Sequence, residues 1–353
     1  MYGTSPSSLT EKVSYEGSIS SESGSFTVQI ASLSPSTKYY YKAYMTVWDG
    51  SQYKDIEGST MEFTTPAFSG VTDRGYLDCY EVPAVTVLQR SSGTETHGST
   101  RYQAYTVSNS KQRVATHTFN YNGVKRNYSL LYDSDKKAAL WVAFAMNTGD
   151  YPWKVSRSDS WKADPAIPVD WQPSLASAYA DGTTYSRGHQ VASNDRRTTT
   201  EQTRQTNYYS NMTPQYSGFN GGMWSQLEGD IQKIGAATSG SDTLYVVTGP
   251  IFGAGYTTAA DKNGTLCAVP TSYYKCIMKV SFSGHTPVSA TGAAYLLEHK
   301  NSGSVRQQKT IDEIEQLTGF DFFASVPAAL QNAAEAESHT TSYFAQQTVP
   351  TVE

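Results

Sequence analysis

The sequence predicts an α+β protein that is preceded by a small all-β segment, and three observations lead to that class. Short runs rich in tyrosine and threonine alternate with turn-forming residues up to residue 66, as antiparallel strands do. Apolar runs typical of buried strands follow, at 138–147 (AALWVAFAMN), 243–252 (TLYVVTGPIF) and in YYKCIMKVSF. Helices are expected at 200–209, 221–236 and 309–318.

Length and composition limit the classes of protein that need to be considered. A chain of 353 residues suits one large domain with a smaller one. Its net charge of −5 argues against a broad basic face that coats nucleic acid, although a local basic site remains possible. No stretch approaches the roughly 18 to 20 apolar residues that span a bilayer.

Cys79, Cys267 and Cys276 allow one disulfide at most. Cys267–Cys276 is the favoured pair, and three free thiols are the equal alternative.

The first 66 residues contain a turn that is similar to one in fibronectin type III modules. In LSPSTKY, Leu33, Pro35, Thr37 and Tyr39 match its L-x-P-x-T-x-Y pattern, and FTTP at 63–66 resembles the last strand of that family. A complete sandwich needs about seven strands, but only four or five fit before Pro66. We therefore expect residues 1–66 to be an incomplete module, with its earlier strands upstream of Met1 or supplied by another chain. A small unrelated β-domain is the alternative.

The remaining chain divides into three further parts. Residues 67–75 contain glycine and serine and directly follow Pro66, and they are expected to be a linker. The larger α+β domain is expected at 76–337. Residues 338–353 lack periodicity and predict a mobile polar tail.

Three motifs occur in order between residues 185 and 233. Arg187, Gly188, His189, Ala192 and Asp195 form the first; Ser210, Asn211, Pro214 and Gln215 form the second; Asn220, Trp224, Leu227 and Glu228 form the third. Together they resemble the R-G-H, S-N-x-x-P-Q and N-x-x-x-W-x-x-L-E patterns of the DNA/RNA non-specific endonuclease family. Three motifs in the family's order are far more specific than any one of them.

The resemblance covers about residues 76–330 and implies a ββα-metal (His-Me finger) nuclease domain with a mixed central sheet. It implies a metal-dependent endonuclease that hydrolyses DNA and RNA regardless of the sugar and leaves 5′-phosphate and 3′-hydroxyl ends. The expected cofactor is Mg²⁺, with Mn²⁺ able to substitute. The family asparagine that matches Asn220 supplies the only direct protein bond to that metal.

The chemistry of phosphodiester hydrolysis gives each motif residue a candidate role. His189 is the expected general base, because imidazole has an ordinary pKa of about 6.5 and accepts a proton at neutral pH. Asn220 offers an amide oxygen, which suits Mg²⁺; the alternative is that it caps a helix beginning at Gly221. Glu228 falls within about a quarter-turn of Asn220 on a helix, where a carboxylate can hold the waters of the metal.

Arginines are the candidates for binding phosphate, because a guanidinium can contact two oxygens at once. Arg157 is the first choice for the transition-state cation, since the family has an arginine before its W-K-x-D-P segment, and Arg187 is the second. The expected substrate-binding residues are Arg196, Arg204, Asn211 and Gln215.

Two positions depart from the family. Ser186 replaces the usual aspartate of the first motif, and Gln232 replaces an arginine that often follows the helical glutamate. Arg196, Arg197 or Arg204 could take over that charge in space; otherwise phosphate binding is weaker.

We therefore expect an exported nuclease, secreted, periplasmic or at the cell surface, whose signal is not part of this chain. The N-terminal module would contact another protein or a surface. The alternative is an exported binding protein whose nuclease-like domain is catalytically weakened, which Ser186, Gln232 and the acidic charge balance motivate.

Overall fold

The computed structural model describes residues 1–10, 12, 38–64, 79–84, 88–97, 100–107 and 109–346, in two compact units of residues 1–72 and 73–353. Most of the expected fibronectin-like turn, the expected linker at 67–75 and residues 347–353 lie outside these ranges. No helix in the described ranges has the length and hydrophobicity that crossing a membrane requires.

The first unit has five strands among its described residues. A three-stranded antiparallel sheet joins β1 (Tyr2–Gly3), β2 (Lys38–Tyr41) and β5 (Met61–Thr64). A hairpin pairs β3 (Tyr44–Trp48) with β4 (Tyr53–Glu57). Tyr39 is buried and stacks on Phe63 with ring centroids 5.9 Å apart. These strands confirm β structure in this segment, while the fibronectin-like sandwich stays a prediction.

The second unit is built on one seven-stranded sheet in which every pairing is antiparallel. Its strands lie in the order β18 (Arg306–Lys309), β17 (Thr286–Glu298), β16 (Ser272–Ser283), β13 (Asp242–Ile251), β10 (Ala138–Met146), β9 (Val124–Asp133) and β8 (Gln112–Asn120). The α+β class is confirmed, but a mixed central sheet was the wrong expectation. Consecutive strands such as β8, β9 and β10 are joined by short turns, which antiparallel pairing permits and parallel pairing does not.

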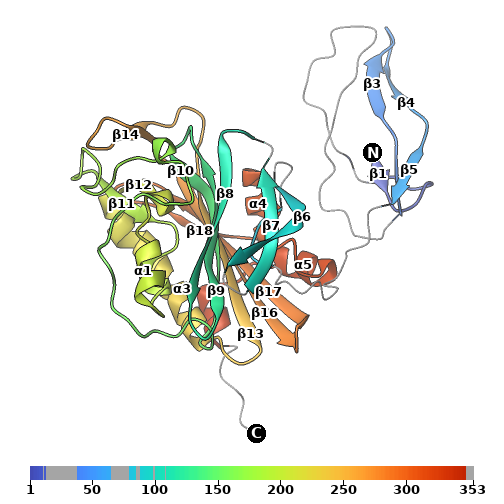
Figure 1. Cartoon of the computed structure of the whole chain (residues 1–353). Helices are drawn as coiled ribbons and strands as arrows, with labels where there is room; N and C mark the ends of the chain where they lie inside the picture. The colour runs from blue at the N-terminus through green and yellow to red at the C-terminus, as the bar shows by residue number, and fades with distance from the viewer. Residues whose placement is uncertain are drawn as a thin grey trace. The chain divides into compact units, whose positions relative to one another are not determined.

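Helices cover both faces of this sheet, so its central strands are apolar on both sides. Figure 1 shows α3 (Ser225–Ala237) on one face and α4 (Ile311–Thr318) with α5 (Ala328–Glu335) on the other. Leu227, Ile231 and Ile234 are fully buried and form the apolar stripe by which α3 packs against the sheet. α4 begins with a capping box between Thr310 and Glu313.

The long connection from β10 to β13 carries all three sequence motifs. It contains β11 (Tyr185–His189), α1 (Thr200–Gln205), β12 (Met212–Tyr216), α2 (Ser217–Phe219), a π-helical turn η4 (Asn220–Trp224) and then α3. β11 and β12 pair as a separate two-stranded sheet, with His189 opposite Met212. Smaller pairs are β6 (Leu88–His97) with β7 (Thr100–Val107), and β14 (Thr258–Ala260) with β15 (Leu266–Ala268).

Four expectations need correction. The helix expected at 200–209 ends at Gln205, and the helical run expected from 221 starts at Ser217. All three cysteines are buried free thiols, so the favoured disulfide is absent: Cys267 lies on β15, whereas Cys276 lies in the middle of β16. The expected mobile tail instead contains α6 (Thr341–Gln346), because Phe344 is fully buried in the core beside α3.

Phe344→Ala tests whether α6 is part of the folded domain. Removing a fully buried phenylalanine side chain should lower the free energy of unfolding by about 3 kcal/mol, through lost burial and a residual cavity. Urea denaturation measures this change. The control Ser342→Ala, at an exposed position of the same helix, should stay within about 0.5 kcal/mol of the parent. Equal stability of the two variants would show that α6 contributes nothing.

Candidate active site

His189 lies at the end of β11, where a second side chain fixes its ring. Nε2 of His189 is 3.0 Å from Oδ1 of Asn207, and the Nδ2 group of Asn207 donates to the carbonyl oxygen of Ser158. Because that donation orients the amide, its oxygen faces the imidazole and favours the tautomer with the proton on Nε2. Nδ1 is then left as the proton acceptor. Asn207 was not singled out from the sequence.

The surroundings of His189 keep its ring neutral. Burial lowers its pKa from 6.5 to about 4, and the positive charges of Arg157 and Arg187 act in the same direction, against the hydrogen bond to Asn207. The Trp161 ring also packs against the imidazole, with centroids 5.4 Å apart. A neutral imidazole with a free Nδ1 has the protonation state that a general base requires.

Asn220 does not cap a helix. Its backbone is helical (φ −59°, ψ −48°), because the chain already winds through α2 before it reaches this residue. The break in this helical run comes at Gly222, whose backbone leaves helical geometry inside η4. The half-buried Asn220 side chain makes no hydrogen bond to any residue that the structure describes. Its amide oxygen therefore remains available to a ligand.

Glu228 carries a buried carboxylate oxygen that lacks a partner. Oε1 has no hydrogen bond among the described residues. Burial raises the pKa of Glu228 to about 8, although the charge of Lys275 opposes this effect. An amide oxygen and a carboxylate, eight residues apart on one helical run, are ligand types that suit a small hard divalent cation, whose charge would restore the ionised form of Glu228.

Lys275, in the middle of β16, has a fully buried side chain close to Glu228 and Asp195. Its Nζ donates to the carbonyl oxygen of Gln190 and to Oγ1 of Thr248, both at 3.2 Å, and lies 4.1 Å from the Trp224 ring centroid. Burial lowers its pKa, while the carboxylates of Glu228 and Asp195 act against that shift. The sequence does offer a signal for this residue, because a lysine inside an apolar central strand, as Lys275 and Lys279 are, is rarely without a partner.

The two candidate phosphate-binding arginines lie in different environments. Nη1 of Arg187 donates to the carbonyl oxygens of Leu175 and Ala176, and its guanidinium stacks 3.7 Å from the centre of the Trp161 ring. Arg187 thus supports the aromatic ring that packs on His189. Arg157 is exposed, and it is close enough to His189 and Glu228 for its charge to lower the pKa of both.

Of the four predicted substrate-binding residues, only Arg204 is exposed, on α1. Arg196 is completely buried, with its guanidinium stacked on the rings of Phe144 and Tyr151, and this position gives phosphate no access to it. Arg197 donates to the carbonyl oxygen of Val155 and stacks on Trp153. The expected contact of Arg196 with substrate therefore does not fit its burial.

Asn211 and Gln215 are also fully buried and belong to the framework of the site. Asn211 accepts from the backbone nitrogen of Val191 and donates to the carbonyl oxygens of Val191 and Thr206, at 2.8 to 3.0 Å. These bonds fix the chain just after His189. The Gln215 side chain packs directly on Gly188, where an added Cβ would lie 2.2 Å from Cδ of Gln215. This contact explains why glycine precedes the histidine.

A separate group of carboxylates lies on the opposite face of the sheet. Asp312, Glu315 and Glu335 bring their oxygens within 4.8 Å of one another on α4 and α5. Burial raises the pKa of Glu315 to about 8 and that of Glu335 to about 9. This cluster shares no residue with the motifs around His189.

Comparison with known proteins gives consistent matches over the second unit. The family described as DNA/RNA non-specific endonuclease matches residues 109–329. A nuclease of Nostoc sp. is 29% identical over 232 residues, which are 62% of this chain and 78% of that protein. A nuclease of Serratia marcescens is 30% identical over 220 residues, 59% of this chain and 77% of that protein. The crystal structure of an EndoG/EndoGI complex aligns with a TM-score of 0.44 and 22% identity, over 60% of this chain and 87% of that one.

Gly188→Ala tests the packing behind the histidine. The new methyl group would overlap Gln215, so we expect a loss of about 1 to 3 kcal/mol in the free energy of unfolding, measured with urea. In a Gln215→Ala background the same substitution should cost much less, because the two residues are in contact. Gly221→Ala is the control, since no atom lies within 4 Å of its added Cβ. Strictly additive costs in the double variant would contradict the contact.

Proposed function

The chain belongs to the DNA/RNA non-specific endonuclease family and is a nuclease, and from this premise we propose that it hydrolyses phosphodiester bonds of both DNA and RNA with His189 as general base. The observation that carries the proposal is the fixed imidazole: Asn207 binds Nε2, and burial keeps the ring neutral. Nδ1 can then take a proton from water beside the exposed guanidinium of Arg157.

In the proposed reaction, His189 removes a proton from water as the water oxygen forms a bond to phosphorus. The bond from phosphorus to the 3′-oxygen breaks, and that oxygen leaves with its electron pair and takes a proton from a second water molecule. The products carry a 5′-phosphate and a 3′-hydroxyl. Asn220 would bind Mg²⁺, or Mn²⁺ in its place, and Glu228 would hold the waters of that ion; the cation would supply positive charge for the phosphate and the departing oxygen.

The cationic residues take different roles in this proposal. The positive charge of Arg157 lowers the pKa of both His189 and Glu228, so the guanidinium would balance the negative charge that develops on the phosphate. Arg187 is held by two backbone carbonyls and would act through Trp161, as a positioning residue for His189. Arg204 would contact the backbone of the substrate farther from the reacting phosphate. The first unit would serve as a fibronectin-like binding module, since every catalytic candidate lies in the second unit.

The division of roles between His189 and Asn220 is the main test. Plasmid DNA and RNA should be cut with Mg²⁺, and EDTA should stop cleavage until excess Mg²⁺ or Mn²⁺ is added. His189→Ala should slow turnover by about 10²- to 10⁴-fold at any metal concentration, because it removes the base. Asn220→Ala should instead raise the metal concentration needed for half activity, and added metal should recover part of the rate.

His285→Ala serves as the matched control for the base variant, because His285 is exposed on the turn between β16 and β17. It should cut as fast as the parent. Full activity of His189→Ala, or full activity in EDTA, would reject the mechanism. The absence of any cleavage by the folded parent would favour the alternative of a weakened nuclease-like domain.

The pH profile tests the environment of His189. Because burial lowers its pKa to about 4, the ring stays neutral across most of the acidic range. The single-turnover rate at saturating Mg²⁺ should therefore hold as pH falls through 6.5, and decline only as pH falls through about 4. Circular dichroism at each pH checks that the protein stays folded. A decline centred near 6.5, the ordinary pKa of histidine, would show that the ring is solvated.

A further inference from the structure

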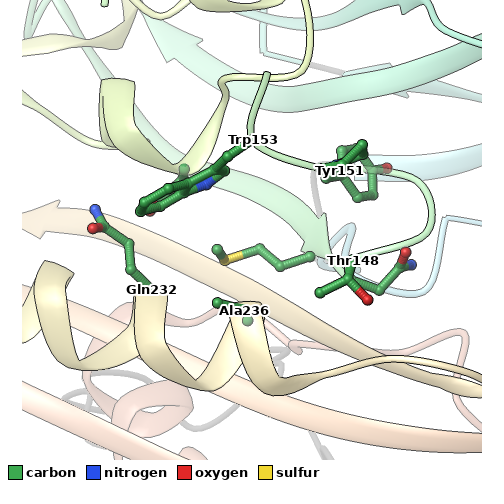
Figure 2. Close-up of a pocket in the computed structure, with 10 residues that line it drawn as sticks. Thr148, Tyr151, Trp153, Gln232 and Ala236 are labelled. Carbon is green, nitrogen blue, oxygen red and sulfur yellow. The ribbon is translucent and has the colours of Figure 1, made fainter. Parts of the chain in front are cut away.

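A cavity of about 280 Å³ lies beside the candidate active site and has no role in the chemistry described above. Figure 2 shows it between the loop that follows β10 and the second half of α3. The residues that line it are Met146, Asn147, Thr148, Tyr151, Pro152, Trp153, Asp195, Gln232, Gly235 and Ala236. We call it the Trp153 pocket.

The Trp153 pocket shares a wall with the active site. Gln232 follows Glu228 by four residues on α3, so the pocket opens one helical turn from the carboxylate. Asp195, on another wall, lies close enough to Glu228 and Lys275 to affect the pKa of both. A group in the pocket would therefore lie about one helical turn from Glu228.

The lining of the pocket suits a flat ring with polar edges. Trp153 is 53% exposed and offers an indole face, and Met146 and Pro152 extend the apolar wall. The amide of Gln232 points toward the indole from the opposite side (Figure 2). An amide both donates and accepts hydrogen bonds: its nitrogen hydrogen-bonds the Asp195 carboxyl, and its oxygen would accept from the edge of a ring stacked on Trp153. The volume is close to the lower limit for small-molecule sites, about 300 Å³, which suits a single ring system.

The rim of the pocket is basic. The guanidinium of Arg197 lies 5.3 Å from the Trp153 ring centroid, and Lys154 is exposed next in the chain. Arg157 lies four residues beyond Trp153 on the same loop and faces the catalytic histidine. Aromatic platforms with cations beside them bind single-stranded nucleic acid, because each base can stack while its phosphate is neutralised.

We propose that the Trp153 pocket binds one unstacked base of the strand that is being cut, with the base stacked on Trp153 and its edge bonded to Gln232. This proposal rests on the proposed nuclease function of the neighbouring site. In a duplex, a base must unstack and unpair before it can enter such a pocket. Single-stranded substrates should therefore be cut faster than duplexes, and the pocket should account for the difference.

Trp153→Ala is the test variant, and it is compared with Trp153→Phe, which keeps an aromatic face. Trp48→Ala is the matched control, because Trp48 is an exposed tryptophan of the first unit. On single-stranded oligonucleotides, Trp153→Ala should reduce kcat/KM by about 5- to 100-fold, the range expected for one lost base stack. Trp153→Phe should keep most of the rate, and duplex cleavage should change less.

A binding measurement separates this proposal from the function on which it rests. The full chain carrying His189→Ala is titrated in EDTA with a single-stranded oligonucleotide and with the same strand containing abasic residues. The base-containing strand should bind about 5-fold more tightly or better, and Trp153→Ala should remove that preference. Equal binding of both strands, or equal effects of Trp153→Ala and Trp48→Ala, would overturn the pocket assignment even if the parent cuts DNA. A preference for bases in a protein that cuts nothing would support the pocket and reject the catalytic proposal.

Discussion

The buried side chain of Lys275 is the constraint on which the geometry of the site depends. An isolated buried charge costs several kcal/mol, so this lysine persists only with its partners in place. Those partners come from different elements: the carbonyl after His189, Thr248 on β13 and the face of Trp224 on η4. Trp224 in turn donates to the carbonyl oxygen of His189. One strand of the central sheet thereby sets the position of β11 relative to the helix that carries Glu228.

Around Lys275, most buried polar side chains of this region form hydrogen bonds with backbone groups. Asn211 satisfies three main-chain groups and fixes the chain after His189, and Asn207 links the imidazole to the loop before Trp161. These hydrogen bonds restrict rotation of the His189 side chain, and the groups that form them are not expected to contact a substrate. They leave exposed side chains, above all Arg157, to meet the phosphate.

The sequence predicted the parts of the fold and the site that depend on local pattern. The three motifs that resemble the nuclease family single out His189, Asn220 and Glu228; the structure places these residues on adjoining elements, and their roles stay predictions. Burial, by contrast, depends on contacts between distant segments. The sequence alone therefore predicts that Arg196 contacts substrate, although the rings of Phe144 and Tyr151 enclose its guanidinium. In the same way, the C-terminal segment lacks periodicity, yet it contains α6, whose Phe344 is buried in the core.

The place of Lys275 in the chain also bears on how the protein is made. β16 follows the three motifs, so a nascent chain on the ribosome displays His189, Asn220 and Glu228 before residue 275 has been synthesised. Until β16 joins the edge of β13, the loop that carries the histidine and the helix that carries the glutamate lack their common anchor. Translation alone thus delays assembly of the site until β16 has emerged.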